Sequence, residues 1–469
     1  MTSRSPSYGL AFVAGILGMV LGALAASTDV LPLVGATSRH GVSGARPPAG
    51  HWQQARAAAS SLSSVPARRG GQDPLHALAD LPYTRGSRTA PEVQSVAQFN
   101  GARAQPGVNL VLSGHSPSAH LIDMKGNVLH EWHKTFDEVW PDGVYTIGSP
   151  TARYFWRRAH LFGNGDLLAI FEGTGMILLD KDSNLKWAYD GQCHHDLSVT
   201  EDGLIYTLGR IQRTDRPEAL SRFPTYLTGD FIEDTVLVLS ADGELKHRSS
   251  ILHCLLRSDY AAAISMSQRE GDFLHTNTIE VMDGRFDDRH PLYRKGNVLV
   301  CVRNCNLLAV LDLEKQDVVW ALQGMFGLPH EPTVIDNGNI LVFDNHRSAD
   351  VSRVLEINPL TREIVWDYYG NQKHPFHSSI CGSNQRLANG NTLIVETTGG
   401  RAFEVGADRA IVWEFFNPFR AGGNDQLIAS IFDCVRLDPQ TLTEGFPEVA
   451  APGPIQLDEA RGLVQDTPR

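Results

Sequence analysis

The residues most able to do acid–base or nucleophilic chemistry in this sequence are its 18 histidines. His195 lies in the segment CHHDLSVTEDG, His275 in FLHTNTIEVMDG and His330 in GLPHEPTVIDNG. Arg303 interrupts the otherwise apolar run VCVRNCNLLAVLD. All four segments lie at predicted strand ends or turns, so their polar side chains would meet if equivalent strands surrounded one axis.

Three imidazoles and one guanidinium would form a donor array for a tetrahedral oxyanion such as sulfate. Arginine suits this role because its planar fork stays charged when water is removed. One imidazole could instead act as a nucleophile. Zinc is an alternative ligand for three histidines, but Arg303 would repel a cation and none of these histidines belongs to a close-spaced H-x-x-x-H pair. The site is therefore predicted to hold neither a metal nor a cofactor.

Further polar residues occupy the same strand ends and have a weaker claim to the site. Five are predicted as additional site residues: His194, Asn277, Asn345, Arg347 and His377. His346, Arg353 and His374 are more distant candidates. Each has a simpler structural interpretation: a histidine can cap a turn, Arg353 can pair with Glu356, and Arg303 can pair with Asp312.

The chain that must position these residues contains a repeated unit of turn, strand and tryptophan. Its clearest copy is NGNILVFDNHRSADVSRVLEINPLTREIVWDYYG, residues 337–370. One residue marks each copy at the end of its last strand: Trp132, Trp187, His247, Trp320, Trp366 and Trp413. Six copies of three or four short strands predict an all-β fold, a six-bladed β-propeller.

Two other β architectures are less compatible with this repeat. A β-sandwich would not require the same order of turn, strand and tryptophan in each copy, and a solenoid would need shorter and more uniform repeats. The first copy, SAHLIDMKGNVLHEWH, lacks its leading strand. We therefore expect strands from both ends of the folded body to share one blade, with insertions near 213–230 and 249–272.

Composition limits the possible partners and supports a β-rich fold. The 469 residues include 43 Gly and 25 Pro, and 42% of them are hydrophobic, which suits a large core with many turns. The net charge is -12, so nucleic acid is not an expected partner. The propeller is expected over 105–437, between a linker of 36–104 and a tail of 438–469.

The first 35 residues are interpreted as an export signal or a membrane anchor. Residues 8–26 are uncharged, and 19 residues are long enough to span a bilayer core. An uncleaved anchor is favoured over a cleaved signal, although Ala23 and Ala25 fit the small-x-small pattern of a cleavage site. A buried core helix is the least favoured interpretation. The propeller is therefore expected outside the cytoplasm and attached to a membrane.

Six cysteines in an exported protein could form up to three disulfides. Cys301 and Cys305 are the nearest pair in sequence. If they lie in one extended strand, their α-carbons are about 13 Å apart, which is beyond the roughly 7 Å reach of a disulfide. These two residues are therefore expected not to pair.

The motifs above resemble the bacterial arylsulfotransferase family that works without phosphoadenosyl phosphosulfate. The resemblance runs from about residue 110 to 418 and includes HHDLSVTEDG, the H-x-N motif and NGNILVFDN, together with NQRLANGNTLIVET and GRAFEV. It implies a six-bladed propeller that transfers a sulfuryl group between phenols through a sulfated histidine. By motif position, His330 is similar to the nucleophile, and His195, His275 and Arg303 are similar to the residues that hold the sulfate oxygens.

Two functional hypotheses follow from the sequence. The first is an exported sulfotransferase whose substrates are a small aryl sulfate and a phenolic acceptor. The second is a propeller without activity that binds a protein partner or serves as an accessory subunit of a membrane complex. The sequence leaves the oligomeric state open.

Overall fold

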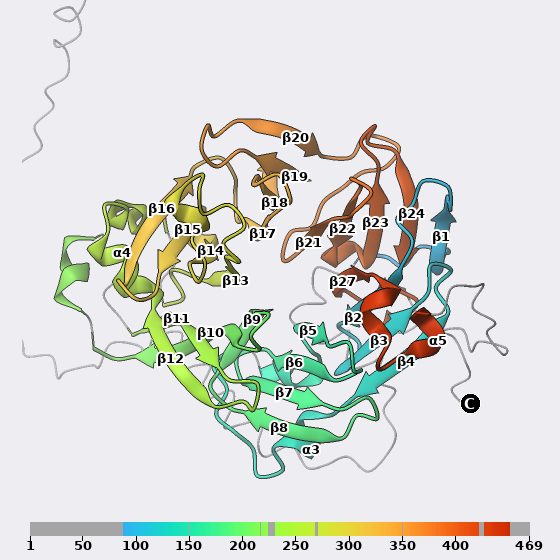
Figure 1. The fold of residues 1–469 in the computed structure, drawn as a ribbon, viewed down its shortest axis with the longest axis horizontal. Coiled ribbons are helices and arrows are strands. Elements are labelled where there is room, and N and C mark those ends of the chain that lie inside the picture. Colours follow the sequence, from blue (N-terminus) through green and yellow to red (C-terminus); the bar gives the residue numbers. More distant parts are fainter. Residues whose placement is uncertain are drawn as a thin grey trace, which may run out of the picture. The chain divides into compact units, whose positions relative to one another are not determined.

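The computed structural model describes residues 88–148, 150–215, 217–223, 230–267, 271–348, 350–421 and 426–450. Strands in these ranges form six antiparallel sheets of four or five strands and one short hairpin. The six sheets surround a common centre in Figure 1. This arrangement confirms the predicted all-β, six-bladed propeller.

Each blade runs from an innermost strand beside the channel to an outermost strand at the rim. Blade 1 consists of β27 (Ile431–Leu437), β2 (Val108–Ser113), β3 (Ser118–Ile122) and β4 (Val128–His133). Blade 2 consists of β5 (Arg158–Leu161), β6 (Leu167–Phe171), β7 (Gly175–Leu179) and β8 (Leu185–Tyr189). Blade 3 consists of β9 (Cys193–Val199), β10 (Ile205–Arg213), β11 (Phe231–Leu239) and β12 (Leu245–Ser250).

The other three blades follow in chain order. Blade 4 consists of β13 (Thr276–Val281), β14 (Val298–Val302), β15 (Leu307–Asp312) and β16 (Asp317–Gln323). Blade 5 consists of β17 (His330–Val334), β18 (Ile340–Ser348), β19 (Val351–Ile357) and β20 (Ile364–Tyr368). Blade 6 consists of β21 (Ser383–Arg386), β22 (Thr392–Glu396), β23 (Arg401–Val405), β24 (Ile411–Phe416) and the added β1 (Ser95–Phe99).

Short helices and one hairpin connect these strands. The α-helices are α3 (Phe136–Val139), α4 (Ile251–Arg257) and α5 (Pro447–Ala450). The 3-10 turns are η2 (Pro150–Tyr154), η3 (Glu218–Arg222), η5 (Ala261–Met266), η6 (Pro291–Tyr293), η7 (Arg303–Cys305), η8 (Thr397–Gly399) and η9 (Pro439–Leu442). The hairpin pairs β25 (Arg420–Ala421) with β26 (Leu427–Ile428). The η3, α4 and η5 elements lie in the two predicted insertions.

The ring closes through the C-terminal strand of the propeller. Strand β27 pairs antiparallel with β2, and Val111 lies opposite Cys434. Strands from both ends of the folded body therefore share blade 1, as predicted from its missing leading strand. Closure pairs the inner edge of this blade, which would otherwise expose unpaired backbone groups.

The repeated tryptophan has a clear structural function. The six marker residues all lie in the outermost propeller strand of their blades, β4, β8, β12, β16, β20 and β24. Four of the indoles donate a hydrogen bond at 3.0–3.2 Å to a backbone carbonyl of the next blade, at Gly165, Ala241, Pro359 and Met124. The repeated residue therefore connects adjacent blades.

Packing between blades explains why the inner and middle strands are buried on both faces. In β14, Val298, Val300 and Val302 belong to the apolar cluster shared with blade 3. The alternate residues Leu299 and Cys301 belong to the cluster shared with blade 5. Successive side chains of a strand point to opposite faces, so each blade contributes one face to each of its two seams.

Ordered structure extends beyond the predicted propeller limits of 105 and 437. Within the predicted linker, β1 pairs with β24 at the outer edge of blade 6. Within the predicted tail, Leu442, Phe446 and Val449 pack into the core of blades 1 and 2. These segments have sequence compositions typical of linkers, but they contain apolar residues that cover exposed blade surfaces.

The predicted export segment, residues 8–26, lies outside the described residues, as does the predicted linker up to residue 87. Among the helices that the structure describes, none is long and apolar enough to cross a membrane. The structure therefore leaves the anchor as a prediction.

The assumption that Cys301 and Cys305 lie in one extended strand was wrong. Strand β14 ends at Val302, and η7 follows it, so the segment is not one extended strand. Cys301 instead packs in the seam toward blade 5 and Cys305 in the seam toward blade 3. All six cysteines are buried as free thiols.

Candidate functional site

Propeller topology brings the start of each inner strand and the turn after each second strand to the same end of the channel. His330 begins β17, His275 immediately precedes β13, and His195 lies near the start of β9. Arg303 does not lie within a strand, because it begins η7 directly after β14. Its backbone N–H donates to the His275 carbonyl at 3.3 Å. The structure therefore places all four at one end of the channel.

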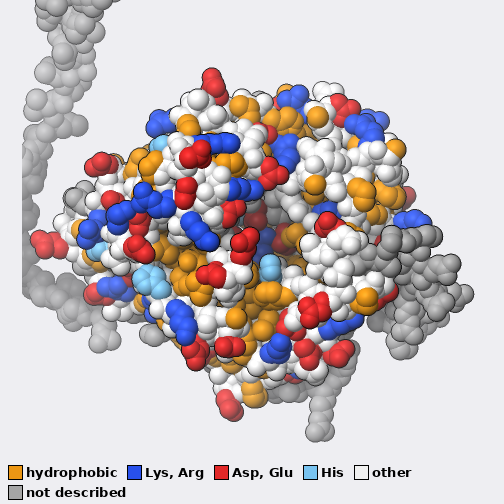
Figure 2. Space-filling model, viewed as in Figure 1, with side chains coloured by type: hydrophobic (Ala, Val, Ile, Leu, Met, Phe, Trp, Pro, Cys, Tyr) orange, Lys and Arg blue, Asp and Glu red, His pale blue; other side chains and the backbone are white. Residues whose placement is uncertain are grey.

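These four residues also lie close enough to influence one another. The ring centroids of His195 and His275 are 5.0 Å apart. Burial lowers the pKa of His330 well below the ordinary value, and the charge of Arg303 lowers it further. The same two effects lower the pKa of His275, against the opposing effect of Asp272. The face viewed in Figure 2 is hollowed at its centre.

A repeated backbone irregularity orients the three histidines. The pairing of β9, β13 and β17 with their neighbouring strands shifts register near His195, His275 and His330. His195, His275 and Glu331 adopt positive φ angles of 60°, 50° and 47°. Such bulges redirect side chains and are frequent near active sites. Strand alternation alone would not predict this orientation.

His330 is held in one tautomer by its surroundings. Its Nδ1 is 2.7 Å from Asn345 Oδ1 and 3.1 Å from the Leu328 carbonyl. Asn345 Nδ2 donates to the carbonyls of Ser378 and Cys381, so its oxygen must face His330. Both neighbours accept a hydrogen bond, so Nδ1 carries the proton. Neutral His330 therefore has its lone pair on Nε2.

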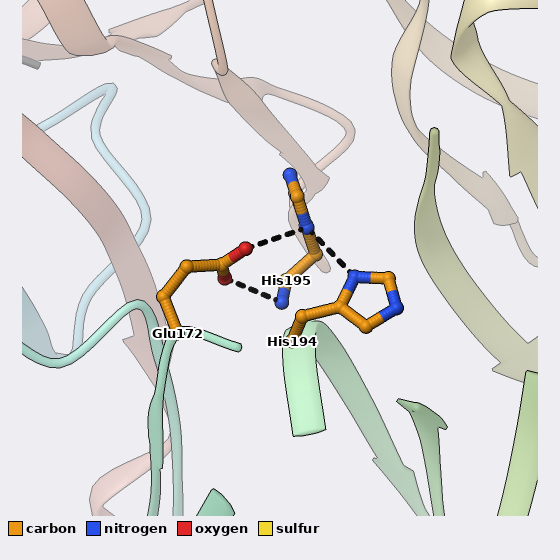
Figure 3. A group of neighbouring side chains, drawn as sticks. All are labelled: Glu172, His194 and His195. Carbon is orange, nitrogen blue, oxygen red and sulfur yellow. Dashed lines mark hydrogen bonds and ion pairs between the residues drawn. The ribbon is translucent and has the colours of Figure 1, made fainter. Parts of the chain in front are cut away.

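His195 contacts a second histidine and a carboxylate at its Nδ1, as Figure 3 shows. The Nδ1 atoms of His194 and His195 are 2.9 Å apart, and Glu172 Oε1 lies 3.1 Å from His195 Nδ1. Glu172 Oε2 also accepts the His195 backbone N–H at 2.8 Å. Burial lowers the pKa of His195 well below its ordinary value, and His275 and Arg210 lower it further. His195 is therefore neutral at neutral pH.

His275 has a carboxylate partner of its own. Its Nδ1 lies 2.6 Å from Asp272 Oδ2. Burial disfavours the charged form of Asp272, but His275 and Arg210 lower its pKa below the ordinary value. An ionised Asp272 accepts a hydrogen bond from Nδ1–H, which leaves the His275 lone pair on Nε2. A carboxylate behind an imidazole favours uptake of a second proton at that nitrogen.

The five additional candidates divide into four groups. Asn345 and Asn277 position His330 or its turn, since Asn277 Nδ2 donates to the Pro329 carbonyl at 2.9 Å. His194 lies behind His195. His377 is 3.5 Å from the hydroxyl of Ser352, whose other bonds reach the Asn345 and Ser378 carbonyls, so it lies outside the central group. The Arg347 side chain lies outside the described part of the chain.

The structure also gives partners to the weaker candidates. Arg353 Nε pairs with Asp344 at 2.7 Å, so the suggested pairing with Glu356 was wrong. Asp312 pairs with Lys315 at 2.6 Å, whereas Arg303 Nη1 donates to Asn304 at 2.8 Å. His346 and His377 have ring centroids 6.2 Å apart. The His374 backbone N–H donates to Asn371 Oδ1 in a loop.

Sequence analysis missed four charged residues that contribute to the site: Arg157, Glu172, Arg210 and Asp272. The position of Arg157, one residue before β5, is equivalent to that of His275 before β13. Glu172 follows β6 as Arg303 follows β14. The charge of Arg157 lowers the pKa of both His195 and His330. An alignment of equivalent blade positions could therefore have identified two of the four.

A buried ionic network lies one residue further along the inner strands. Arg158 Nε and Nη1 pair with Asp196 and Asp433 at 2.9 and 2.7 Å, and Nη2 pairs with Glu331. Asp196 Oδ2 also accepts the Ile279 backbone N–H, and the Glu331 carbonyl accepts a bond from Asn384. Burial raises the pKa of Asp196 and Glu331. All six blades contribute to this network.

Glu172, His194 and His195 also have the donor atoms of a metal site, since their ligand atoms all lie within 4.8 Å of one another. Arg210 Nη1 lies 3.3 Å from Glu172 Oε1. This guanidinium would repel a cation held by the same carboxylate, and it balances the Glu172 charge without one. The geometry therefore favours a hydrogen-bonding function over metal binding.

The fold and the site together define a propeller with a group of histidines and arginines at one end of its channel. The family described as Arylsulfotransferase (ASST) matches residues 158–418, which is more than half of the chain. The chain therefore belongs to the arylsulfotransferase (ASST) family. The match includes all four central residues predicted from the sequence. No curated protein matches the chain.

The solved structures that match this chain are distant from it in sequence. A protein of unknown function from Bacteroides caccae has a TM-score of 0.45 and 14% identity, covering 67% of this chain and 96% of its own. The Cps50 (Swd1) β-propeller domain of Myceliophteria thermophila has a TM-score of 0.41 and 9% identity, covering 71% and 90%. Virginiamycin B lyase from Staphylococcus aureus has a TM-score of 0.36 and 10% identity, covering 69% and 89%.

Proposed function

We propose that this protein transfers a sulfuryl group from a phenolic sulfate ester to a phenolic acceptor through a sulfated His330. The observation that carries the proposal is the state of His330. Two acceptors at Nδ1 place its lone pair on Nε2, and burial and Arg303 hold its pKa well below the ordinary value. A neutral imidazole with a free lone pair is the form that acts as a nucleophile.

In the first half-reaction, His330 Nε2 attacks the sulfur of the donor. The bond between sulfur and the phenolic oxygen breaks, and its electron pair leaves with that oxygen. Arg303 and Arg157 are the cations that would stabilise the charge on the transferring group. His195 or His275 would pass to the leaving phenolate the proton that it accepts from the acceptor phenol of the preceding turnover.

In the second half-reaction, the acceptor phenol attacks the sulfur of sulfated His330. The sulfur–nitrogen bond breaks, and its electron pair returns to Nε2. His195 or His275 takes the phenolic proton through its own Nε2. Glu172 and Asp272 stabilise the imidazolium ions that form, because each carboxylate faces the other ring nitrogen.

A sulfate-transfer assay tests this proposal. The purified protein is supplied with p-nitrophenyl sulfate and phenol, and p-nitrophenol release and phenyl sulfate formation are measured. We expect His330→Ala to abolish both products and to remove the mass gain of one sulfuryl group that the intact protein acquires from the donor. His253→Ala is the control, since this exposed histidine of α4 lies outside the site.

Failure of the intact protein to transfer sulfate or to become sulfated would contradict the proposal. That result would favour the second hypothesis, in which the propeller binds a partner without turning over a substrate. An export route and a membrane anchor, proposed from the N-terminal sequence, are compatible with both functions.

A further inference from the structure

Two buried polar atoms face each other behind the pocket without a hydrogen-bond partner. His194 and Asp234 are both 0% exposed. His194 Nε2 and Asp234 Oδ1 lie 3.6 Å apart, and neither makes a hydrogen bond to any described residue. Buried polar groups are rarely left in this state in folded proteins, and such exceptions occur at functional sites.

His194 is also joined directly to the pocket. Its Nδ1 lies 2.9 Å from His195 Nδ1, and this contact holds a single proton. If the proton is on His195, its Nε2 has a lone pair and can accept a proton. If the proton is on His194, His195 Nε2 carries hydrogen and can donate to an oxyanion. The shared proton therefore determines what His195 offers to a substrate.

We infer that His194 and Asp234 form a proton relay that switches His195 between acceptor and donor, an inference that rests on the proposed sulfuryl transfer. When an acceptor phenol gives its proton to His195 Nε2, the Nδ1 proton of His195 moves to His194 Nδ1. The Nε2 proton of His194 then moves to Asp234 Oδ1. The reverse sequence delivers this proton to the phenolate that leaves in the next turnover.

The charges around the relay suit this function. Burial, followed by the charge of Asp272, raises the pKa of Asp234 to about 7. Burial, followed by the charge of Arg210, lowers the pKa of His194 well below its ordinary value, although Glu172 and Asp272 oppose this. Near neutral pH the histidine is neutral and the carboxyl can either hold or release a proton.

The backbone holds Asp234 in place while leaving Oδ1 free. Asp234 Oδ2 accepts the Thr276 backbone N–H at 2.7 Å, and Thr276 directly follows His275. His194 adjoins His195 in β9, and Asp234 lies in β11. Both strands belong to blade 3, with β10 between them. The relay therefore lies within blade 3, and the hydrogen bond from Thr276 anchors it to blade 4.

The proton held on Asp234 matters most for sulfate donors whose leaving group is a basic phenolate. Phenols with a pKa near 10 leave slowly unless they are protonated as the bond breaks, whereas p-nitrophenolate leaves readily without assistance. A relay mutant should therefore discriminate between donors. A mutant that only disturbs the fold should slow all donors by the same factor.

The test compares Asp234→Asn with the wild-type protein on a series of aryl sulfates. Asparagine keeps the acceptor for Thr276 but cannot take up a proton. We expect kcat/KM for phenyl sulfate to fall by about 10²-fold or more, with p-nitrophenyl sulfate close to wild type. His194→Phe should give the same pattern. Glu404→Gln is the matched control, since Glu404 is 0% exposed but pairs with Arg436 in another part of the ring.

A second readout does not require turnover. Nitrogen-15 NMR of labelled histidine reports which ring nitrogen of His195 carries hydrogen. Sodium sulfate should shift His195 from the Nδ1–H to the Nε2–H tautomer in the wild-type protein and less in Asp234→Asn. An equal loss for all donors, or a tautomer that sulfate leaves unchanged, would overturn the relay. If wild type turns over no aryl sulfate, the proposed function fails and the tautomer measurement decides the relay alone.

Discussion

At the scale of single residues, the group that contacts the Nδ1 atom of each pocket histidine determines the chemistry of that histidine. His330 faces the neutral amide of Asn345, His275 faces the carboxylate of Asp272, and His195 faces both Glu172 and His194. An amide fixes a tautomer and favours protonation only weakly, so that burial and Arg303 still lower the pKa of His330, whereas a carboxylate favours the imidazolium more strongly. In the proposed mechanism, this difference separates the nucleophile His330 from the acid–base groups His195 and His275.

The amide behind His330 leads to a prediction about pH. Because the pKa of His330 is lowered, its nucleophilic form persists below pH 6.5 and activity should fall only as pH drops through the lowered value. Asn345→Asp places a carboxylate at Nδ1, which raises this pKa. We expect the acid limb of the kcat/KM profile for p-nitrophenyl sulfate to move to higher pH.

The pH profile distinguishes this positioning function from simple damage to the fold. Asn345→Asp also loses two donors to backbone carbonyls, so a lower plateau is expected in addition to the shift. A lower plateau with an unmoved acid limb would contradict the assignment of Asn345. Thermal unfolding of both proteins at the assay pH serves as the control.

At the scale of elements, the sequence predicted the blades better than their ends. The marker residues were found because they recur at the same place in every copy, and four of the six make the same blade-to-blade hydrogen bond. The bulges at His195, His275 and His330 were not found, because positive φ in a non-glycine residue leaves no clear trace in one sequence. Proline and glycine near β1 and α5 led to the prediction of a linker and a tail. The apolar residues that fix these segments are too few to form a recognisable strand or helix pattern.

The carboxylates of the pocket were missed for a related reason. Glu172 and Asp272 lie in turns, where acidic residues are common, and only their position in the blade separates them from solvent-exposed ones. His195, His275, His330 and Arg303 were predicted because they stand out beside strand-like segments. The carboxylates that contact them can be identified only when the fold shows which turns lie at the same end of the channel as the starts of the inner strands.

The segment predicted as a C-terminal tail gives a test at this scale. Phe446 is 1% exposed and lies 5.8 Å from the Trp132 ring in the seam between blades 1 and 2. Phe446→Ala should lower the free energy of unfolding by about 3–5 kcal/mol, because it removes a buried ring and leaves a cavity. Chemical denaturation measures this loss. A loss similar to that of an exposed substitution such as Leu360→Ala would contradict a structural function of the segment.

At the scale of the whole molecule, the channel has different functions at different depths. The histidines lie at one end, and the Arg158 network with Asp196, Glu331 and Asp433 crosses the channel below them. A buried arginine with three carboxylates is costly to disrupt, since removal of one partner leaves uncompensated charge. The network therefore forms a rigid floor for the pocket, and substrate is expected to enter from the histidine end.

The remaining prediction concerns how the molecule is held in the cell. We propose that residues 8–26 remain as a membrane anchor, because 19 uncharged residues at about 1.5 Å each approach the roughly 30 Å thickness of a bilayer core. The full chain should fractionate with membranes, resist extraction by high salt and keep its first residues. Leu17→Arg should release it, since a charge at the centre of a span costs about 2.5–3.5 kcal/mol. A soluble mature form beginning at Ala26 would show instead that the segment is a cleaved signal, and the linker would then leave the propeller free to diffuse outside the cytoplasm.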